Sequence, residues 1–280
     1  MTNEAKAKRT GKATVFSDLF HIMQYTTKLA RALCHDESVT DKDIRLITLQ
    51  PVLLNEPYND LGLLVRDRLF ILVEAQSTWS LNVLPRLLLY MAATMHEYIT
   101  AHCKRSIYSS TRIHLPKPEF FVIYTGDRKN CPDEISLAAD FWNDPNAAVD
   151  LKAKVLHRPH KDDIVGQYIM FCQILDTQIK LYGRTLKAIT ETIRICEDEG
   201  VLKNYLETRK KEVVSIMTTL FDQAYAVDSY ANERYEEGQK YGALRGAVEM
   251  CQELGQSFDS AVSRLAKKFN LPLEIGRAHV

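Results

Sequence analysis

Residues 60–76 read DLGLLVRDRLFILVEAQ, and the architecture expected for the chain depends on this segment. Two apolar runs, Leu61–Val65 and Leu69–Val73, are separated by the polar connector at residues 66–68. Short apolar runs bounded by polar residues are typical of buried β-strands. The segment therefore predicts a hairpin of two strands inside a sheet.

The length of the connector sets which side chains face each other. A three-residue loop would pair Val65 with Leu69 and bring Asp60 opposite Glu74, which shares a face with Gln76 because side chains alternate along a strand. Directly opposite residues have Cβ atoms about 5 Å apart, and like charges there repel each other. A divalent cation between the two carboxylates would remove that cost. A loop of two or four residues would turn Asp60 to the other face, so the inference depends on the register.

Composition places the chain among ordinary globular proteins. Its 280 residues, 46% hydrophobic and 26% charged, suffice for one large domain or for a core with an appendage. Lys+Arg and Asp+Glu both number 36, so no global basic surface indicates tight non-specific DNA binding, although a local patch remains open.

The cysteines and the apolar runs indicate a cytoplasmic protein. The six cysteines are scattered without a Cys-x-x-Cys pair, which suits reduced thiols and not a disulfide framework or a zinc ribbon. The polar and basic residues 1–12 do not form a secretory signal. Every apolar run is broken by charge before the ~18 residues that a membrane span needs, so no membrane partner is expected.

Helices and strands are expected to alternate around the hairpin. The apolar spacing of residues 16–33 predicts a helix capped by Thr14 or Ser17, and a long helix capped by Ser80 or Asn82 is expected to run to about Arg105. Further strands are predicted at 44–49 and 118–124 and, at the edge of the sheet, at 151–156. Helices are predicted at 164–181, 185–196 and 205–225, and the spacing of Phe258, Val262, Leu265 and Phe269 predicts a short amphipathic helix.

These patterns divide the chain into five parts. A disordered N-terminus (1–13) precedes an α/β core (14–158), a helical region packed on that core (159–226) and a helical tail (227–274). The last six residues, 275–280, continue no pattern and are interpreted as read-through of a sequencing adapter. The natural chain is therefore expected to continue beyond Glu274.

Three glycines recur at a spacing of four in the tail. Gly238, Gly242 and Gly246 are interpreted first as part of a solvated, marginal helix, because each costs about 1 kcal/mol relative to alanine. The alternative is a smooth face for close helix approach, which would allow a homodimer through the C-terminal helices.

The order helix, strand, Asp-headed strand, strand ending in Glu-x-Gln, helix, strand resembles the PD-(D/E)XK nuclease superfamily. The closer likeness is to its bacterial branch of transposases and recombination-promoting nucleases. The bare Asp and Glu-x-Gln pattern is weak alone, but a longer set of motifs across most of residues 14–225 is specific. These motifs are YNDLG (58–62), VEAQSTWS (73–80), RLLLY (86–90), YTGDR (124–128) and LYGRT (181–185).

The resemblance implies a restriction-endonuclease-like core and a Mg²⁺-dependent DNA endonuclease linked to transposition or recombination, with Mn²⁺ as a possible substitute. Asp60 and Glu74 would bind the metal, with the backbone carbonyl of Ala75 as a further ligand, which suits the preference of Mg²⁺ for oxygen. Gln76 would be the third catalytic residue, at the place where many relatives carry lysine. Glutamine can orient a water but supplies no charge, so slower or more metal-dependent activity is expected.

Three further positions carry two interpretations each. Arg86 and Tyr90 share a helix face, as a polar-x-x-x-Tyr pair does near the phosphate in relatives, or they are a solvated and a core-edge residue. Asp18 is a second-metal carboxylate or, more in keeping with its place at a helix start, a capping or dipole partner. A catalytically weak or inactive remnant of the same fold that binds DNA or protein is the alternative function, because Gln76 and the neutral net charge leave room for it.

Overall fold

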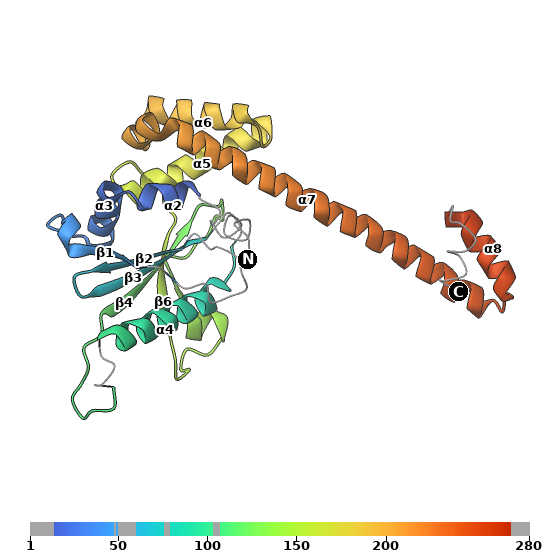
Figure 1. The fold of residues 1–280 in the computed structure, drawn as a ribbon, viewed down its shortest axis with the longest axis horizontal. Helices are drawn as coiled ribbons and strands as arrows, with labels where there is room; N and C mark the ends of the chain where they lie inside the picture. Colours follow the sequence, from blue (N-terminus) through green and yellow to red (C-terminus); the bar gives the residue numbers. More distant parts are fainter. Residues whose placement is uncertain (1–13, 48, 50–59, 76–78, 103–106, 270–280) are drawn as a thin grey trace, which may run out of the picture. The chain divides into compact units, whose positions relative to one another are not determined.

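The computed structural model in Figure 1 describes residues 14–47, 49, 60–75, 79–102 and 107–269. The side chains of residues 73–75, 227, 228 and 258 also lie outside this description. The chain divides into two compact units, residues 1–220 and 221–280. The first unit contains a mixed β-sheet covered by helices, and the second is helical, so the expectation of an α/β core followed by a helical region is confirmed at this level.

A six-stranded sheet forms the centre of the first unit, in the order β1-β2-β3-β4-β6-β5. Strands β1 to β3 form an antiparallel meander, β3, β4 and β6 are parallel, and β5 is antiparallel to β6. Their bounds are β1 Ile44–Ile47, β2 Leu61–Val65, β3 Arg68–Ala75, β4 Lys117–Tyr124, β5 Glu134–Ser136 and β6 Lys152–Leu156.

Helices cover both faces of this sheet. Figure 1 shows α4 on one face, and α2, α3 and α5 on the other, with α6 beside α5. Two irregular turns, a 3₁₀ turn at Asp41–Asp43 and a π-helical turn at Leu137–Phe141, complete the first unit. The helices are α2 Val15–Phe20, α3 Met23–Cys34, α4 Val83–His102, α5 Ile164–Tyr182, α6 Leu186–Glu199, α7 Lys203–Glu253 and α8 Phe258–Phe269.

The hairpin between β2 and β3 is tighter than predicted. Val65 pairs with Arg68, so the loop has two residues, and the predicted three-residue loop is wrong. Arg66 takes the first loop position with a φ of 53°, as a type II′ turn requires. Arg68 is the first residue of β3, and its guanidinium donates two 2.8 Å hydrogen bonds to Glu119 of the neighbouring β4. Leu61 pairs with Leu72 in this register.

The sheet buries large side chains on both faces. On the α4 side, Leu69 and Ile71 of β3 and Val122 of β4 pack against Leu84 and Leu87 of α4. Because side chains alternate, Phe70 and Phe121 lie on the other face, where their rings meet edge-on at 5.7 Å. Burial of these apolar side chains holds the meander and the parallel strands together as one sheet.

The single helix predicted at residues 16–33 is wrong, because the structure has two helices there, α2 and α3, but one of its two predicted caps is confirmed. The Thr14 side chain accepts a hydrogen bond from the backbone N–H of Ser17 and caps α2. Asp163 caps α5 by accepting from Val165 and Gly166. Capping side chains satisfy backbone donors that the first turn leaves unpaired, so such caps can be found from sequence.

Three other predictions about elements differ from the structure. The strand at Lys152–Leu156 is not an edge strand, because β5 pairs outside it. The sequence treats residues 134–136 as loop, yet they form β5, which ends where Asp150 accepts hydrogen bonds from Ser136 and Ala138. The predicted helix at 205–225 is part of the longer α7, whose helical geometry is interrupted at Arg209 (φ −125°, ψ 24°).

The second unit packs α8 against the end of α7. Leu244 and Val248 of α7 meet Leu265 of α8 in a small apolar cluster, as the predicted amphipathic stripe requires. A Cβ added at Gly238, Gly242 or Gly246 meets no atom within 4 Å among the described residues, as a solvated helix predicts. The homodimer stays a prediction.

None of the helices within the described ranges has the length and apolar character needed to cross a bilayer.

Candidate active site

The carboxyl ends of β3 and β4 meet at one edge of the sheet. Glu74 lies opposite Ile123, and Ala75 lies opposite Tyr124, the last residue of β4. Leu156 at the end of β6 lies opposite Ile123 as well. In sheets with parallel strands, ligands bind in the crevice outside the carboxyl ends of the strands. This carboxyl edge is therefore the candidate active site.

The carboxyl edge carries the backbone of two predicted metal ligands. Glu74 and Ala75 are the last two residues of β3. The Glu74 side chain and the whole of Gln76 lie outside the described residues. Their predicted roles, and that of the Ala75 carbonyl, therefore stay predictions.

Asp60 lies at the same edge. Because β2 runs antiparallel to β3, its first residue Leu61 lies near the end of β3, and Asp60 directly precedes it. One further step of the observed register would set Asp60 opposite Val73 and not opposite Glu74. The argument for directly paired carboxylates therefore loses its basis, and a shared metal ion rests on the family resemblance alone.

The tighter loop turns Asp60 toward α4, where it meets Arg86. The Asp60 side chain is 3% exposed, and its Oδ2 lies 3.4 Å from Nε of Arg86. A second contact of 3.4 Å joins Nη2 of Arg86 to Oδ1 of Asp60. A buried carboxylate is costly without a partner, so this two-pronged contact stabilises Asp60 in place.

Arg86 and Tyr90 have different surroundings although they share a helix face. Arg86 is bound to Asp60 and not solvated, which sequence reasoning did not predict. Tyr90 is 2% exposed and belongs to the apolar cluster between α4 and the sheet, in keeping with its interpretation as a core residue. The structure thus brings Asp60 and Arg86 together, with Tyr90 in the core.

Among the predicted metal ligands of this edge, Asp60 is the one whose side chain is described; it offers the hard oxygen donor that Mg²⁺ prefers, and it is already bound by Arg86. The Asp60 carboxylate is a hard donor, fixed on one side by Arg86, and a carboxylate has more lone pairs than that contact uses. Among the described side chains, no group of three or more His, Cys, Asp or Glu residues could hold a metal ion. Glu74, the predicted second carboxylate, is not among those side chains.

The Asp18 carboxylate accepts hydrogen bonds from residues that are distant in sequence. Arg209 donates hydrogen bonds of 2.9 Å and 2.7 Å to its two oxygens, and the Tyr205 hydroxyl donates a third of 2.7 Å. Burial, followed by the hydrogen bond to Asp18, raises the pKa of the Tyr205 phenol. The partners lie 187 and 191 residues away in the chain, and no local pattern could indicate them.

An aromatic and cationic stack at the carboxyl edge was also missed from sequence. Trp79 lies edge-on to Tyr124, with ring centroids 5.3 Å apart and an interplanar angle of 90°. The guanidinium carbon of Arg128 lies 4.6 Å from the centroid of the Trp79 ring. The motifs VEAQSTWS and YTGDR both pointed to these residues, but neither motif indicates that they stack.

A cavity of about 580 Å³ lies beside the loop that follows β4. Burial raises the pKa of Asp176 in its wall, Lys180 opposes the rise, and the charge of Asp127 adds to it. Its described lining consists of Thr125, Gly126 and Asp127 from the loop, and of Gln173, Asp176, Thr177, Ile179 and Lys180 from α5.

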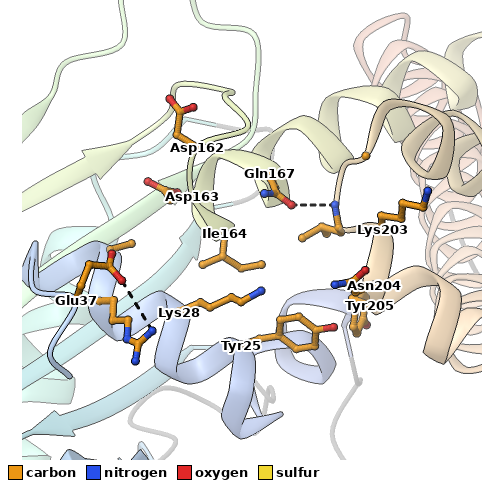
Figure 2. Close-up of a pocket in the computed structure, with 14 residues that line it drawn as sticks. Tyr25, Lys28, Glu37, Asp162, Asp163, Ile164, Gln167, Lys203, Asn204 and Tyr205 are labelled. Atoms are coloured by element: carbon orange, nitrogen blue, oxygen red, sulfur yellow. Dashed lines mark hydrogen bonds and ion pairs between the residues drawn. The ribbon is translucent and has the colours of Figure 1, made fainter. Parts of the chain in front are cut away.

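A second cavity, of about 440 Å³, lies where α3, α5 and the start of α7 meet. Figure 2 shows the Lys28 side chain extending between Tyr25 and Ile164. The Gln167 side-chain oxygen accepts a 3.0 Å hydrogen bond from the backbone N–H of Leu202, which joins α5 to the start of α7. None of its described lining residues comes from β3, β4 or α4, so we treat this cavity as a helix junction.

Comparison of the chain with protein-family models, with curated proteins and with solved structures gives no match in any of the three. The family assignment therefore stays a prediction from the quoted motifs.

Proposed function

We propose that the chain is a Mg²⁺-dependent endonuclease that hydrolyses phosphodiester bonds in DNA and acts in transposition or recombination. One observation carries the proposal: Asp60 heads β2 at the edge where β3 ends in Glu74 and Ala75, although the two-residue loop turns Asp60 to the face opposite the one expected for direct pairing with Glu74. This edge lies within the element order α3, β1, β2, β3, α4, β4, which is the order that the resemblance implies. We assign the sheet and these helices to a restriction-endonuclease-like core.

The residues of this edge have separate tasks in the proposed reaction. Asp60, Glu74 and the Ala75 carbonyl would hold Mg²⁺, which when bound lowers the pKa of a water ligand and stabilises charge on the phosphate. Arg86 orients the Asp60 carboxylate through its two contacts. The Gln76 amide can position the attacking water by hydrogen bonds, but it neither titrates nor carries charge.

A plasmid-nicking assay tests the proposal. Asp60→Asn and Glu74→Gln keep side-chain size and remove the charge that binds the cation, so nicking in Mg²⁺ should fall about 100-fold or more, because metal catalysis contributes several kcal/mol. Asp67→Asn is the matched control, because Asp67 is an exposed residue of the hairpin loop. Equal nicking by the parent and both site variants overturns the proposal.

The runner-up function is a non-catalytic remnant of the same fold that binds DNA or protein. The Asp60–Arg86 pair favours it, because an arginine already balances the buried carboxylate without a metal. Isothermal titration with Mg²⁺ or Mn²⁺ separates the two functions. The nuclease binds a divalent ion that Asp60→Asn releases, whereas the remnant takes up none at this residue.

We also place the protein in the cytoplasm. The proposal rests on the scattered cysteines of the sequence, which form no disulfide framework pattern.

A further inference from the structure

Arg128 follows the end of β4 at the carboxyl edge. It is the last residue of the motif YTGDR, which begins at Tyr124, and Tyr124 lies opposite Ala75 of β3. Adjacent strands are about 4.8 Å apart, so the loop that starts at Thr125 leaves the sheet beside the strand that carries Glu74. The sequence motif had no assigned task, and the fold places it at the proposed site of hydrolysis.

The stack with Trp79 orients the Arg128 guanidinium. Its central carbon lies 4.6 Å from the centroid of the indole ring. Trp79 is itself fixed edge-on against Tyr124, which is 3% exposed. A guanidinium over an aromatic face keeps its in-plane N–H groups available for hydrogen bonds. The arginine is therefore preorganised while its donors remain usable.

Within the described residues, no carboxylate lies within 4 Å of Arg128 to neutralise it. Arg86 at the same edge is bound to Asp60, and Arg68 at the other end of β3 is bound to Glu119. Arg128 is also exposed, so an incoming ligand can reach its guanidinium. A cavity of about 580 Å³ lies between the three residues directly before Arg128 and α5, and Arg128 is not among its described lining residues.

We propose that Arg128 binds a DNA phosphate at the carboxyl edge and supplies the positive charge that Gln76 lacks. The inference rests on the proposed nuclease function for its place in the reaction. A planar guanidinium donates two parallel hydrogen bonds to phosphate oxygens, and bonds of this charge-assisted kind are stronger than neutral ones. Trp79 is a positioning residue that acts through Arg128.

DNA binding tests the inference apart from cleavage. The full chain carrying Glu74→Gln, whose nicking should fall about 100-fold or more on the proposed mechanism, is titrated onto a fluorescent 25-base-pair duplex at several salt concentrations. Adding Arg128→Ala should weaken binding about 10- to 100-fold, as for loss of a charge-assisted contact. It should also reduce the slope of log K against log salt by about 0.9, the effect of one phosphate. Arg128→Lys should bind the duplex with an affinity between that of the Glu74→Gln protein and that of the same protein with Arg128→Ala.

Arg112→Ala is the matched control. Arg112 is an exposed arginine in the loop before β4, so it lies at the opposite end of a strand about 23 Å long. Arg112→Ala changes the net charge by the same amount as Arg128→Ala and should alter the affinity for DNA less than twofold. Trp79→Leu should reproduce part of the loss of DNA affinity that Arg128→Ala causes. A melting temperature within about 3 °C of the parent shows that this loss does not come from a disturbed contact between Trp79 and Tyr124.

The outcomes separate the two proposals. Equal affinities and equal salt slopes for Arg128→Ala and Arg112→Ala overturn the phosphate assignment, as does absence of DNA binding by the parent. If the parent nicks no faster than Glu74→Gln while Arg128→Ala still loses affinity and slope, the nuclease proposal fails and the phosphate contact stands.

Discussion

Removal of Arg86 should leave a buried carboxylate without the guanidinium that balances it. Loss of one partner of a fully buried ion pair costs about 3–5 kcal/mol. The Arg86 side chain is 20% exposed and both contacts measure 3.4 Å, so for Arg86→Met we expect about 2–3 kcal/mol. At about 2–4 °C per kcal/mol for a unit of this size, the melting temperature should fall by about 4–12 °C.

The assay is a double-mutant cycle followed by chemical denaturation. Asp60→Asn removes the charge that Arg86 balances, so the double variant should be more stable than the sum of the single effects by about 1–2 kcal/mol. Arg45→Met, on the exposed side of β1, makes the same change away from any described ion pair and should be near neutral. Single effects that add within about 0.5 kcal/mol refute the reasoning.

The same variant also links stability to the metal hypothesis. If Asp60 binds Mg²⁺, the ion and Arg86 stabilise the same charge, and Mg²⁺ should restore part of the stability that Arg86→Met loses. At a free Mg²⁺ concentration ten times Kd, linkage adds about 1.4 kcal/mol. The gain should vanish in the double variant with Asp60→Asn, and an equal gain there would place the ion elsewhere.

Three other predictions follow from packing and ion pairs. Asp18→Ala removes the acceptor of three hydrogen bonds and should cost about 2–4 kcal/mol in urea unfolding, whereas a loss below 1 kcal/mol contradicts the network. Gly62→Ala puts a Cβ 2.9 Å from the Ile47 carbonyl oxygen and should cost about 1–3 kcal/mol. Gly242→Ala, at a helix position with open space, should instead stabilise the protein by about 0.5–1 kcal/mol. If both glycine substitutions change the free energy of unfolding in the same direction, the packing explanation is wrong. The hydrogen bond from Arg68 lowers the pKa of Glu119 in the folded state. The ionised Glu119 therefore stabilises the fold above its unfolded pKa of about 4.3, and this stabilisation is lost as the pH falls through the lower pKa of the folded state. Glu119→Gln should make the free energy of unfolding depend less on pH in that range.

The strands around Asp60 could be predicted, whereas their register could not. The runs at 61–65 and 69–73 are apolar because both are buried, and that signal is local. Arg68 looks like a loop residue in sequence, but it pairs with Val65 in the ladder, and its guanidinium also binds Glu119, 51 residues away on β4. A change of one residue in the loop turns Asp60 to the other face, so a register that local sequence does not encode sets where a catalytic candidate points.

The missed elements have the same kind of cause. The segment before Asp150 is rich in turn residues, yet β5 forms there by pairing with β6, whose residues lie 16 to 20 positions further along the chain, and Asp150 binds Ser136 and Ala138 at the end of β5. Helix α7 continues through Gly238 and Gly242, where propensity alone argues for an end. Caps such as Thr14 were found because the side chain and the N–H it binds are three residues apart.

The neutral composition of the chain is compatible with DNA as a substrate if the charge is organised locally. At the carboxyl edge, Arg86 is bound to the Asp60 carboxylate, so its charge is not available to a phosphate. Arg128 differs, because an aromatic ring and not a carboxylate holds it among the described residues. Its charge is therefore not cancelled by a described carboxylate, which an equal count of 36 basic and 36 acidic residues does not reveal. On the proposed function, attraction for DNA would depend on where such charges lie and not on their total, so a neutral net charge does not argue against a phosphate contact at Arg128.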